Sequence, residues 1–379
     1  MPVRTLFAVM LLVTGQRLLA QSTQPIIIKA SSQMVDIRDG NLLKKASWRI
    51  SPEAKPDVYT TSNKNKRVSF ITDIDSISFV VKPEKKYDFI ILLNNKDTAY
   101  TRVVFKPSHL DVLKNAKDYN TNDKRAVPAF TYQPANNANL QVLRSTWKLD
   151  SVAGSGNEAS KIINLLHWVH NFIPHDGNHE NPVIKNAMSM IAECKKGDRG
   201  LNCRGLATVL NECYLSMGIP SRFVTCMPKD SIFDDCHVIN LVYSRELKKW
   251  LWIDPTNDAY VMDEKGELLD IREVRERLIN GKMLIVNPDA NWNHKSSAVK
   301  EEYLYRYMAK NLYRFECPLV SEYDVETRIK GKSIPYLELL PLDGYKQLPQ
   351  KNEYTNPKTG VTFINYKTNN PDIFWALPQ

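Results

Sequence analysis

The chain has 379 residues, a formal net charge of +9 at pH 7 and 25% charged residues. This length accommodates two or three domains. The lysines and arginines are spread along the chain rather than gathered in a dense basic block, which argues against a nucleic-acid-binding protein. Six cysteines in so long a chain are too few to build a fold from disulfides, so we expect a hydrophobic core to stabilise it.

Residues 1–20 have the pattern of a secretory signal peptide. Arg4 precedes an apolar run over residues 6–13, and Ala20 is a small residue before the expected cleavage point. The apolar run is shorter than the ~20 residues needed to cross a bilayer, and no later stretch comes close. We therefore expect a secreted or periplasmic protein without a membrane span. Because that compartment permits disulfides, Cys226 and Cys236, which flank a short loop, are the pair we expect first.

The next part of the chain, residues 25–106, has the composition of a β-rich domain. Short runs rich in valine, isoleucine, phenylalanine, tyrosine and threonine alternate with turn-forming stretches such as NKNK, KPEKK and NNKD. Such a pattern predicts a sandwich or barrel, and QPANNAN at 133–139 has the composition of a linker. We therefore expect an all-β, sandwich-like accessory domain over residues 21–140. Its predicted strands include 67–73, 76–81, 87–93 and 99–105.

Three segments after the linker have helical periodicity. Apolar residues recur at helical spacing in 158–174, where Pro174 ends the run. Residues 181–197 show the same spacing from Val183 to Ala192, and residues 203–217 show it before Gly218.

The spacing of apolar residues then changes to two. Strands are predicted for SRFVTCM (221–227), CHVINLVYS (236–244) and KWLWIDP (249–255). Residues 313–329, 335–342 and 360–366 have a similar composition and also predict strands. Helices packed on a mainly antiparallel sheet are the α+β pattern. We expect this second domain over residues 141–379, with the strands after about residue 300 completing the sheet or forming a small extension.

Cys203 lies at the predicted start of a helix, in the segment GLNCRGLA. Unpaired backbone N–H groups at a helix N-terminus carry partial positive charge, which favours a thiolate over a thiol. Such a sulfur is suited to nucleophilic attack, whereas Cys213, farther along the helix among apolar neighbours, is expected to pack in the core. Taken alone, Cys203 could equally be a buried free thiol.

A thiolate nucleophile needs a base, usually histidine, and the histidine needs an acceptor that orients its ring. His237 begins one predicted strand and Asp254 ends the next. A hairpin turn centred between Arg245 and Glu246 would pair His237 directly with Asp254 on one face of the sheet. The spacing therefore predicts a Cys203–His237–Asp254 triad.

The blocks GLNCRGLA, CHVINLVY and WLWIDPTND together resemble the transglutaminase-like superfamily of papain-like thiol enzymes, over residues 158–260. The resemblance implies a papain-like core in which Cys203 is the nucleophile, His237 the general base and acid, and Asp254 the group that orients its ring. It also implies a peptide or protein substrate and no cofactor. Gly200 lies one position farther from the cysteine than is usual in the family.

Acyl transfer also needs donors for the carbonyl oxygen. The backbone N–H of Cys203 is one expected donor. Asn202 is a weak candidate for a second donor, and His175 is a candidate for the wall of the cleft.

Three alternatives remain open at this point. Glutamine-to-lysine cross-linking shares its first half-reaction with amide hydrolysis, and a non-catalytic protein could use the same fold to bind a glycan or a protein. His167, His170, His175 and His179 are also dense enough to suggest zinc, but their spacing matches no metal motif and we predict no metal site.

Overall fold

The computed structural model describes residues 25–197, 199–233 and 235–378 and divides the chain into two compact units, residues 1–107 and 108–379. The predicted signal peptide lies outside the described residues. Within them, no helix is both long enough and apolar enough to span a membrane.

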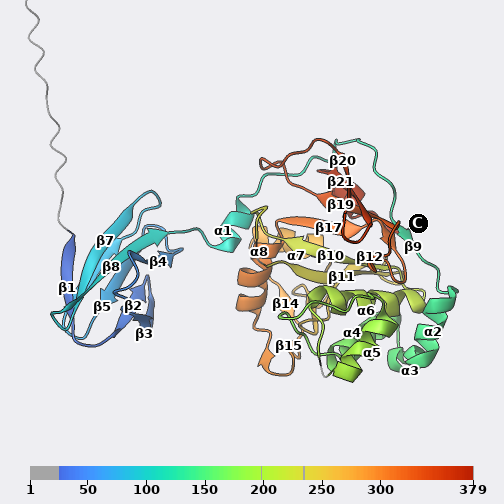
Figure 1. Cartoon of the computed structure of the whole chain (residues 1–379), viewed down its shortest axis with the longest axis horizontal. Coiled ribbons are helices and arrows are strands. Elements are labelled where there is room, and N and C mark those ends of the chain that lie inside the picture. The colour runs from blue at the N-terminus through green and yellow to red at the C-terminus, as the bar shows by residue number, and fades with distance from the viewer. Residues whose placement is uncertain (1–24, 198, 234, 379) are drawn as a thin grey trace, which may run out of the picture. The chain divides into compact units, whose positions relative to one another are not determined.

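The first unit is the β-rich module that the sequence predicts. Its described residues form two four-stranded sheets, β1-β7-β8-β4 and β3-β2-β5-β6 (Figure 1). Phe70 of β5 and Phe89 of β7 meet edge-on at 5.0 Å in the core between the sheets. The unit is thus a sandwich. Its strands are β1 (Ile26–Ala30), β2 (Met34–Asp39), β3 (Leu42–Arg49), β4 (Asp57–Thr61), β5 (Arg67–Ile71), β6 (Ser76–Val80), β7 (Lys86–Leu93) and β8 (Asp97–Phe105).

The domain boundary lies at residues 107/108 rather than at the predicted 140/141. Residues 108–140 are not part of the sandwich, because their apolar side chains pack against the core of the second unit; Leu113 is fully buried there, and Phe130 and Tyr132 lie against the same cluster. A linker-like composition at 133–139 therefore marks a surface connection within the second unit.

A mixed sheet forms the centre of the second unit. Its nine described strands run in the order β14-β13-β12-β11-β10-β17-β19-β21-β20, and all neighbours are antiparallel except β19 and β21. The predicted C-terminal strands thus extend the sheet, and the α+β expectation is confirmed. The sheet strands are β10 (Ser221–Met227), β11 (His237–Ser244), β12 (Lys249–Asp254), β13 (Ala259–Met262), β14 (Ile285–Val286), β17 (Arg314–Pro318), β19 (Ser333–Leu339), β20 (Lys351–Thr355) and β21 (Thr362–Thr368).

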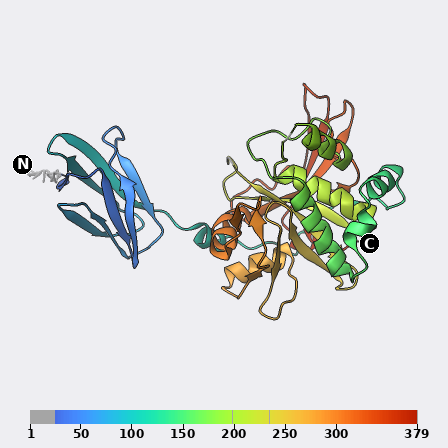
Figure 2. The ribbon, with the colours of Figure 1, turned by 90° about the horizontal axis from the view of Figure 1, so that it is seen from below.

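Helices cover both faces of this sheet (Figures 1 and 2). On one face, side chains of α3 to α6 pack with Val242, Leu251 and Ile253 of the strands. The helices and short strands of the unit are α1 (His109–Lys114), β9 (Thr131–Tyr132), α2 (Ala138–Thr146), α3 (Leu149–Ala153), α4 (Glu158–Phe172), α5 (Ala187–Gly197), α6 (Cys203–Ser216), α7 (Ile271–Ile279), β15 (Asn291–Trp292), β16 (Ser296–Ser297), the π-helix η1 (Glu301–Met308), α8 (Ala309–Asn311), β18 (Val320–Ser321) and α9 (Pro371–Phe374).

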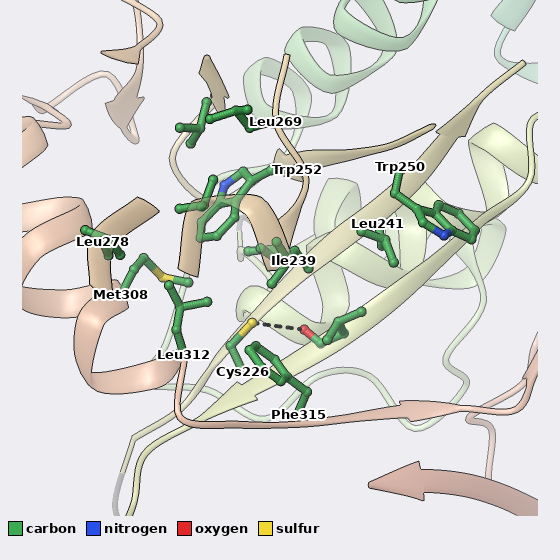
Figure 3. Packing of buried hydrophobic residues seen from close by; sticks show 14 of the residues in the cluster. Cys226, Ile239, Leu241, Trp250, Trp252, Leu269, Leu278, Met308, Leu312 and Phe315 are labelled. Carbon is green, nitrogen blue, oxygen red and sulfur yellow. Dashed lines mark hydrogen bonds between the residues drawn. The ribbon is translucent and has the colours of Figure 1, made fainter. Parts of the chain in front are cut away.

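The opposite face carries a separate apolar cluster. Figure 3 shows Ile239 and Trp252 of the sheet packed with Met308 and Leu312. Met308 is the last residue of η1, and Leu312 directly follows α8. Adjacent residues of one strand point to opposite faces, so β11 and β12 each contribute to both clusters. Because both faces are covered, these strands are almost continuously apolar rather than alternating with polar residues.

Two predicted elements differ from the structure. The helix expected over 181–197 begins only at Ala187, whose backbone N–H donates to the Glu212 carboxylate at 2.7 Å; Val183 is 85% exposed before it. The strand expected over 313–329 ends at Ser321 and is followed by turns. In both cases local apolar content extended the prediction past the true end of the element.

Candidate active site

Cys203 is the first residue of α6, so its side chain lies at the N-terminal end of the helix. Asn202 caps this end: its Oδ1 accepts the backbone N–H groups of Arg204 at 3.1 Å and Gly205 at 3.2 Å. Asn181 Nδ2 donates to the same oxygen at 2.7 Å. The side-chain oxygen of Asn202 is therefore engaged in capping, and the partly exposed Cys203 begins the helix in the field of its dipole.

His237 and Asp254 contact each other from neighbouring strands. His237 Nε2 lies 2.8 Å from Asp254 Oδ2, and both side chains are almost completely buried. The predicted direct pairing is wrong, because the observed register pairs Asn240 with Ile253 and is shifted by two from the predicted one. A shift of two preserves the face, so the two side chains meet as diagonal neighbours.

Four donors fix the Asp254 carboxylate. Besides His237, Tyr303 donates to Oδ2 at 2.7 Å and Asn257 at 3.0 Å, while the Thr256 backbone N–H donates to Oδ1 at 2.9 Å. Burial raises the pKa of Asp254, but the charge of His237 and these side-chain hydrogen bonds outweigh burial and hold the pKa below its usual value. Asp254 is therefore a stable anion that orients the imidazole.

Tyr303 is held in turn by Trp252, whose Nε1 donates to the Tyr303 hydroxyl at 3.1 Å. Tyr303 lies on the π-helix η1, and π-helical turns are frequent at functional sites. The adjacent Tyr307 packs edge-on against the His237 ring, with 5.3 Å between ring centroids. The sequence reasoning missed both tyrosines, because they lie about fifty residues after Asp254 and carry no local signature.

Two histidines lower the pKa of the Cys203 thiol. Burial raises the pKa of the thiol, but hydrogen bonds from His175 and His237, the charge of His237 and the backbone N–H of Val238 outweigh burial and lower it to about 6. Burial lowers the pKa of His237, whereas the charge and hydrogen bond of Asp254 and the contact with Cys203 raise it to about 10. Between these values the pair is a thiolate and an imidazolium, the activated form of a thiol nucleophile.

Two of the three triad side chains border a cavity of about 920 Å³. Cys203 and His237 line it, whereas Asp254 is buried behind His237. The cavity also contains side chains of both signs, including Arg306, Glu302 and Asp235. The nucleophile is thus accessible from a cavity large enough for several residues of a peptide, while the orienting carboxylate is shielded from water.

The four clustered histidines have separate partners. His175 lies in the cavity wall, His170 Nδ1 contacts the Pro255 carbonyl at 3.0 Å, and His179 Nδ1 contacts Asp176 at 2.6 Å. His167 Nδ1 lies 2.8 Å from Asp258. Among the described residues, His167, Asp258 and Asp289 are the set that could hold a metal ion, with ligand atoms within 4.8 Å of one another. None of these three residues lines the cavity that Cys203 borders.

The cysteines are unpaired in the structure. Cys226 and Cys236, the pair expected to form a disulfide, are both free thiols, as is Cys203. Cys226 is completely buried in the core, which Figure 3 shows, and Cys213 is buried as predicted.

Comparison with known proteins identifies this domain. Residues 145–255, which contain all three triad positions, match the family model described as the transglutaminase-like superfamily. These residues form a transglutaminase-like domain. At this family level, the match supports a cysteine-dependent enzyme.

Other comparisons add little to the transglutaminase-like assignment. No curated protein matches the chain. Among solved structures, a proposed cysteine protease from Cytophaga hutchinsonii is similar, with 19% identity, a TM-score of 0.26 and coverage of 37% of this chain. This chain matches 43% of the length of that protein.

Proposed function

We propose that the protein is a secreted thiol enzyme that cleaves peptide or protein amides through an acyl-enzyme on Cys203. The observation that supports this most directly is the chain of contacts from Cys203 to His237 to Asp254 at the wall of an open cavity. The signal-peptide pattern of residues 1–20 supports export to the periplasm or the medium, which N-terminal sequencing of the exported protein checks.

The reaction begins with the thiolate of Cys203 attacking the carbonyl carbon of the scissile amide. The S–C bond forms, and the electron pair of the C=O bond moves to oxygen. His237, as the imidazolium, then gives its proton to the departing amine nitrogen while the C–N bond breaks. In the second half-reaction His237 takes a proton from water, whose oxygen displaces the sulfur and releases the acid.

We favour hydrolysis over cross-linking because water is always present and the sequence marks no site for an amine. Cross-linking of glutamine to lysine is the alternative with the same acyl-enzyme. A non-catalytic glycan- or protein-binding role, for which the β-sandwich would serve, is the other alternative; the complete triad argues against it.

Alkylation of Cys203 by iodoacetamide should follow a titration with a midpoint near pH 6, because only the thiolate reacts and its pKa is lowered to about 6. The reaction should therefore accelerate as pH rises through 6, well below the ~8.5 of a free thiol. In His237→Ala the midpoint should move upward, since burial raises the thiol pKa and the imidazolium no longer opposes it. Peptide mapping by mass spectrometry at each pH measures the rate.

The half-exposed Cys194, whose pKa burial raises, is an internal control in the same samples. A His179→Ala variant, altered at a histidine outside the cavity, should retain the wild-type profile. Equal rates for Cys203 and Cys194 at pH 7 would refute the activated thiol.

Incubation with casein and dansylcadaverine should distinguish hydrolysis from transamidation. The proposal predicts new peptides with free carboxylates that are absent with Cys203→Ala, and little dansyl label on casein. Fluorescent casein without new peptides would favour cross-linking. If casein and other unfolded proteins are neither cleaved nor labelled, the binding role would be favoured. Mass spectrometry of the products gives the answer.

A further inference from the structure

His175 is held beside Cys203 by its own backbone. Asp176 N donates to Leu201 O at 2.8 Å and Leu201 N donates to Pro174 O at 3.1 Å, so the segment after α4 runs as a parallel bridge beside the segment that leads into α6. A Cβ atom at Gly200 would lie 2.2 Å from Pro174 O, so this close approach requires glycine at that position. The bridge pairs His175 with Leu201, which lies two residues before Cys203. It also explains why the glycine before Cys203 is at position 200.

The β15–β16 hairpin also contacts His175. Asn293, in the turn between β15 and β16, accepts His175 N at 2.6 Å and donates Nδ2 to His175 O at 2.8 Å. Trp292 of β15 donates its indole Nε1–H to His175 Nδ1 at 3.2 Å. Backbone and ring are thus positioned by the same hairpin.

The Trp292 contact determines where the proton of His175 lies. An indole N–H can only donate, so Nδ1 of His175 must be an acceptor and carry no proton. The ring is then neutral with its proton on Nε2, because an imidazolium would place two N–H groups against each other. The His175 side chain also hydrogen-bonds Cys203 and lines the same cavity, and with Nδ1 occupied by Trp292 the Nε2–H is the group that faces the sulfur.

The other donor at this place is the backbone N–H of Cys203. Asn202 caps the N–H groups of Arg204 and Gly205 instead, and among the residues that the structure describes no acceptor takes the Cys203 N–H. A carbonyl oxygen bound next to the sulfur would therefore meet donors from two sides, one from the helix and one from the loop after α4.

We infer that His175 is a catalytic residue whose Nε2–H is the second oxyanion donor, and that Trp292 is a positioning residue that keeps its ring in this tautomer. The inference rests on the proposed function. When the sulfur attacks and the carbonyl electron pair moves to oxygen, the negative charge lies between the Cys203 backbone N–H and His175 Nε2–H. His175 transfers no proton; the proton for the leaving amine still comes from His237.

The test compares two reactions of Cys203 in the full-length protein. Acylation by 4-nitrophenyl acetate passes through an oxyanion, whereas alkylation by iodoacetamide does not. The release of 4-nitrophenol in a single turnover measures the acylation rate. Both are measured at a pH where alkylation has reached its plateau, so that a changed thiol pKa has no influence. His175→Ala should lower the acylation rate on the order of 10²-fold and the plateau alkylation rate by less than about threefold.

Two further variants separate a donor from a structural role. His175→Gln offers an amide N–H in a side chain of similar reach, and it should recover a large part of the acylation rate lost in His175→Ala. His179→Ala, on the same loop but outside the cavity, should react like the wild type in both assays. Loss of acylation in His175→Gln equal to that in His175→Ala would contradict the donor role.

The positioning role of Trp292 is tested by the tautomer of His175, which a loss of stability alone would not change. In ¹⁵N NMR of histidine-labelled protein, the resonances missing from His175→Gln identify His175, and they should show a ring protonated at Nε2. In Trp292→Phe, which keeps an aromatic ring but loses the N–H, the Nδ1-protonated form should become populated and acylation should fall several-fold with unchanged alkylation. An Nδ1-protonated His175 in the wild type would overturn the inference.

The outcomes distinguish this inference from the proposed function. If the wild type neither acylates nor alkylates Cys203 faster than Cys194, the thiol-enzyme proposal itself fails. If the wild type reacts rapidly and His175→Ala acylates equally fast, only the role of His175 fails.

Discussion

Replacing Asp254 by asparagine should lower kcat on the order of a thousandfold while leaving the fold intact. The carboxylate accepts three hydrogen bonds at Oδ2 and one at Oδ1. An asparagine that turns its oxygen toward His237 places its NH₂ against the Thr256 N–H, and the opposite orientation places the NH₂ against His237. In either orientation the negative charge that favours the His237 imidazolium is lost. Casein hydrolysis, measured as kcat and KM, gives the effect.

The pH dependence of Asp254→Asn should identify the cause. Because the Asp254 charge raises the pKa of His237 and the His237 charge lowers the pKa of Cys203, the midpoint of Cys203 alkylation should move upward from about 6. The substitution therefore removes thiolate as pH falls toward neutrality. Alkylation should recover at alkaline pH, whereas amide hydrolysis should not, because the Asp254 charge no longer favours the His237 imidazolium that protonates the leaving amine.

Asp258→Asn is the matched control for this change. Asp258 is also buried, lies four residues later in the same turn region and pairs with His167 at 2.8 Å outside the cavity. Its φ of 48° is a left-handed conformation that asparagine tolerates well. Activity should remain within about threefold of the wild type. Equal losses in both variants would show that the turn, rather than the charge on Asp254, supports the reaction.

The placement of His237 and Asp254 on one face of the sheet could be predicted from the sequence, but the hairpin register could not. The strand-like sequences around His237 and Asp254 predict which side chains point to the same face of the sheet. The turn SRELKK contains no glycine or asparagine to mark the left-handed residue, and in the structure Lys248 adopts it with φ of 56°. The turn is therefore centred one residue later than predicted, and the facing is preserved because the register shift is even.

His175 was predicted to line the cleft and does so. Tyr303 and Trp292 were beyond prediction, because they come from distant segments. Tyr303 reaches Asp254 from a π-helix, and Trp292 reaches His175 from a short hairpin. Neither segment has the sustained periodicity that identifies α6 or β11. A hydrogen bond between residues 117 positions apart depends on tertiary packing, and local sequence pattern carries no information about it.

The start of α5 was predicted too early for a different reason. Val183 and Ile184 continue the apolar spacing of the helix, yet the helix begins at Ala187, where Glu212 of α6 accepts its first N–H. Asn186 directly before this helix also caps it, because its Oδ1 accepts the Ser189 N–H at 2.9 Å. The cap was therefore present in the sequence, but the apolar residues before it extended the prediction to residue 181. The start of α4, which Asn157 caps, agrees with prediction.

Trp252→Ala should reduce the free energy of unfolding of the second unit by roughly 3–5 kcal/mol. The Trp252 side chain is completely buried between the sheet and the helices that cover it (Figure 3), so its removal leaves a cavity that the packed neighbours cannot fill. At about 2–4 °C per kcal/mol for a domain of this size, Tm should fall by roughly 10 °C. Differential scanning calorimetry measures the change.

The same substitution tests whether core packing and the catalytic carboxylate are coupled. Trp252 donates to the Tyr303 hydroxyl, which donates to Asp254, so its loss frees Tyr303 to rotate and weakens one of the hydrogen bonds that fix the anion. Casein hydrolysis at a temperature where the variant is fully folded should therefore fall severalfold. Trp168→Ala is the matched control, because Trp168 is half-buried, stacks on Phe172 at 5.0 Å and has no contact with the triad network. It should lose less than half as much stability and keep its activity; an equal loss of stability in the two variants would contradict the central position assigned to Trp252.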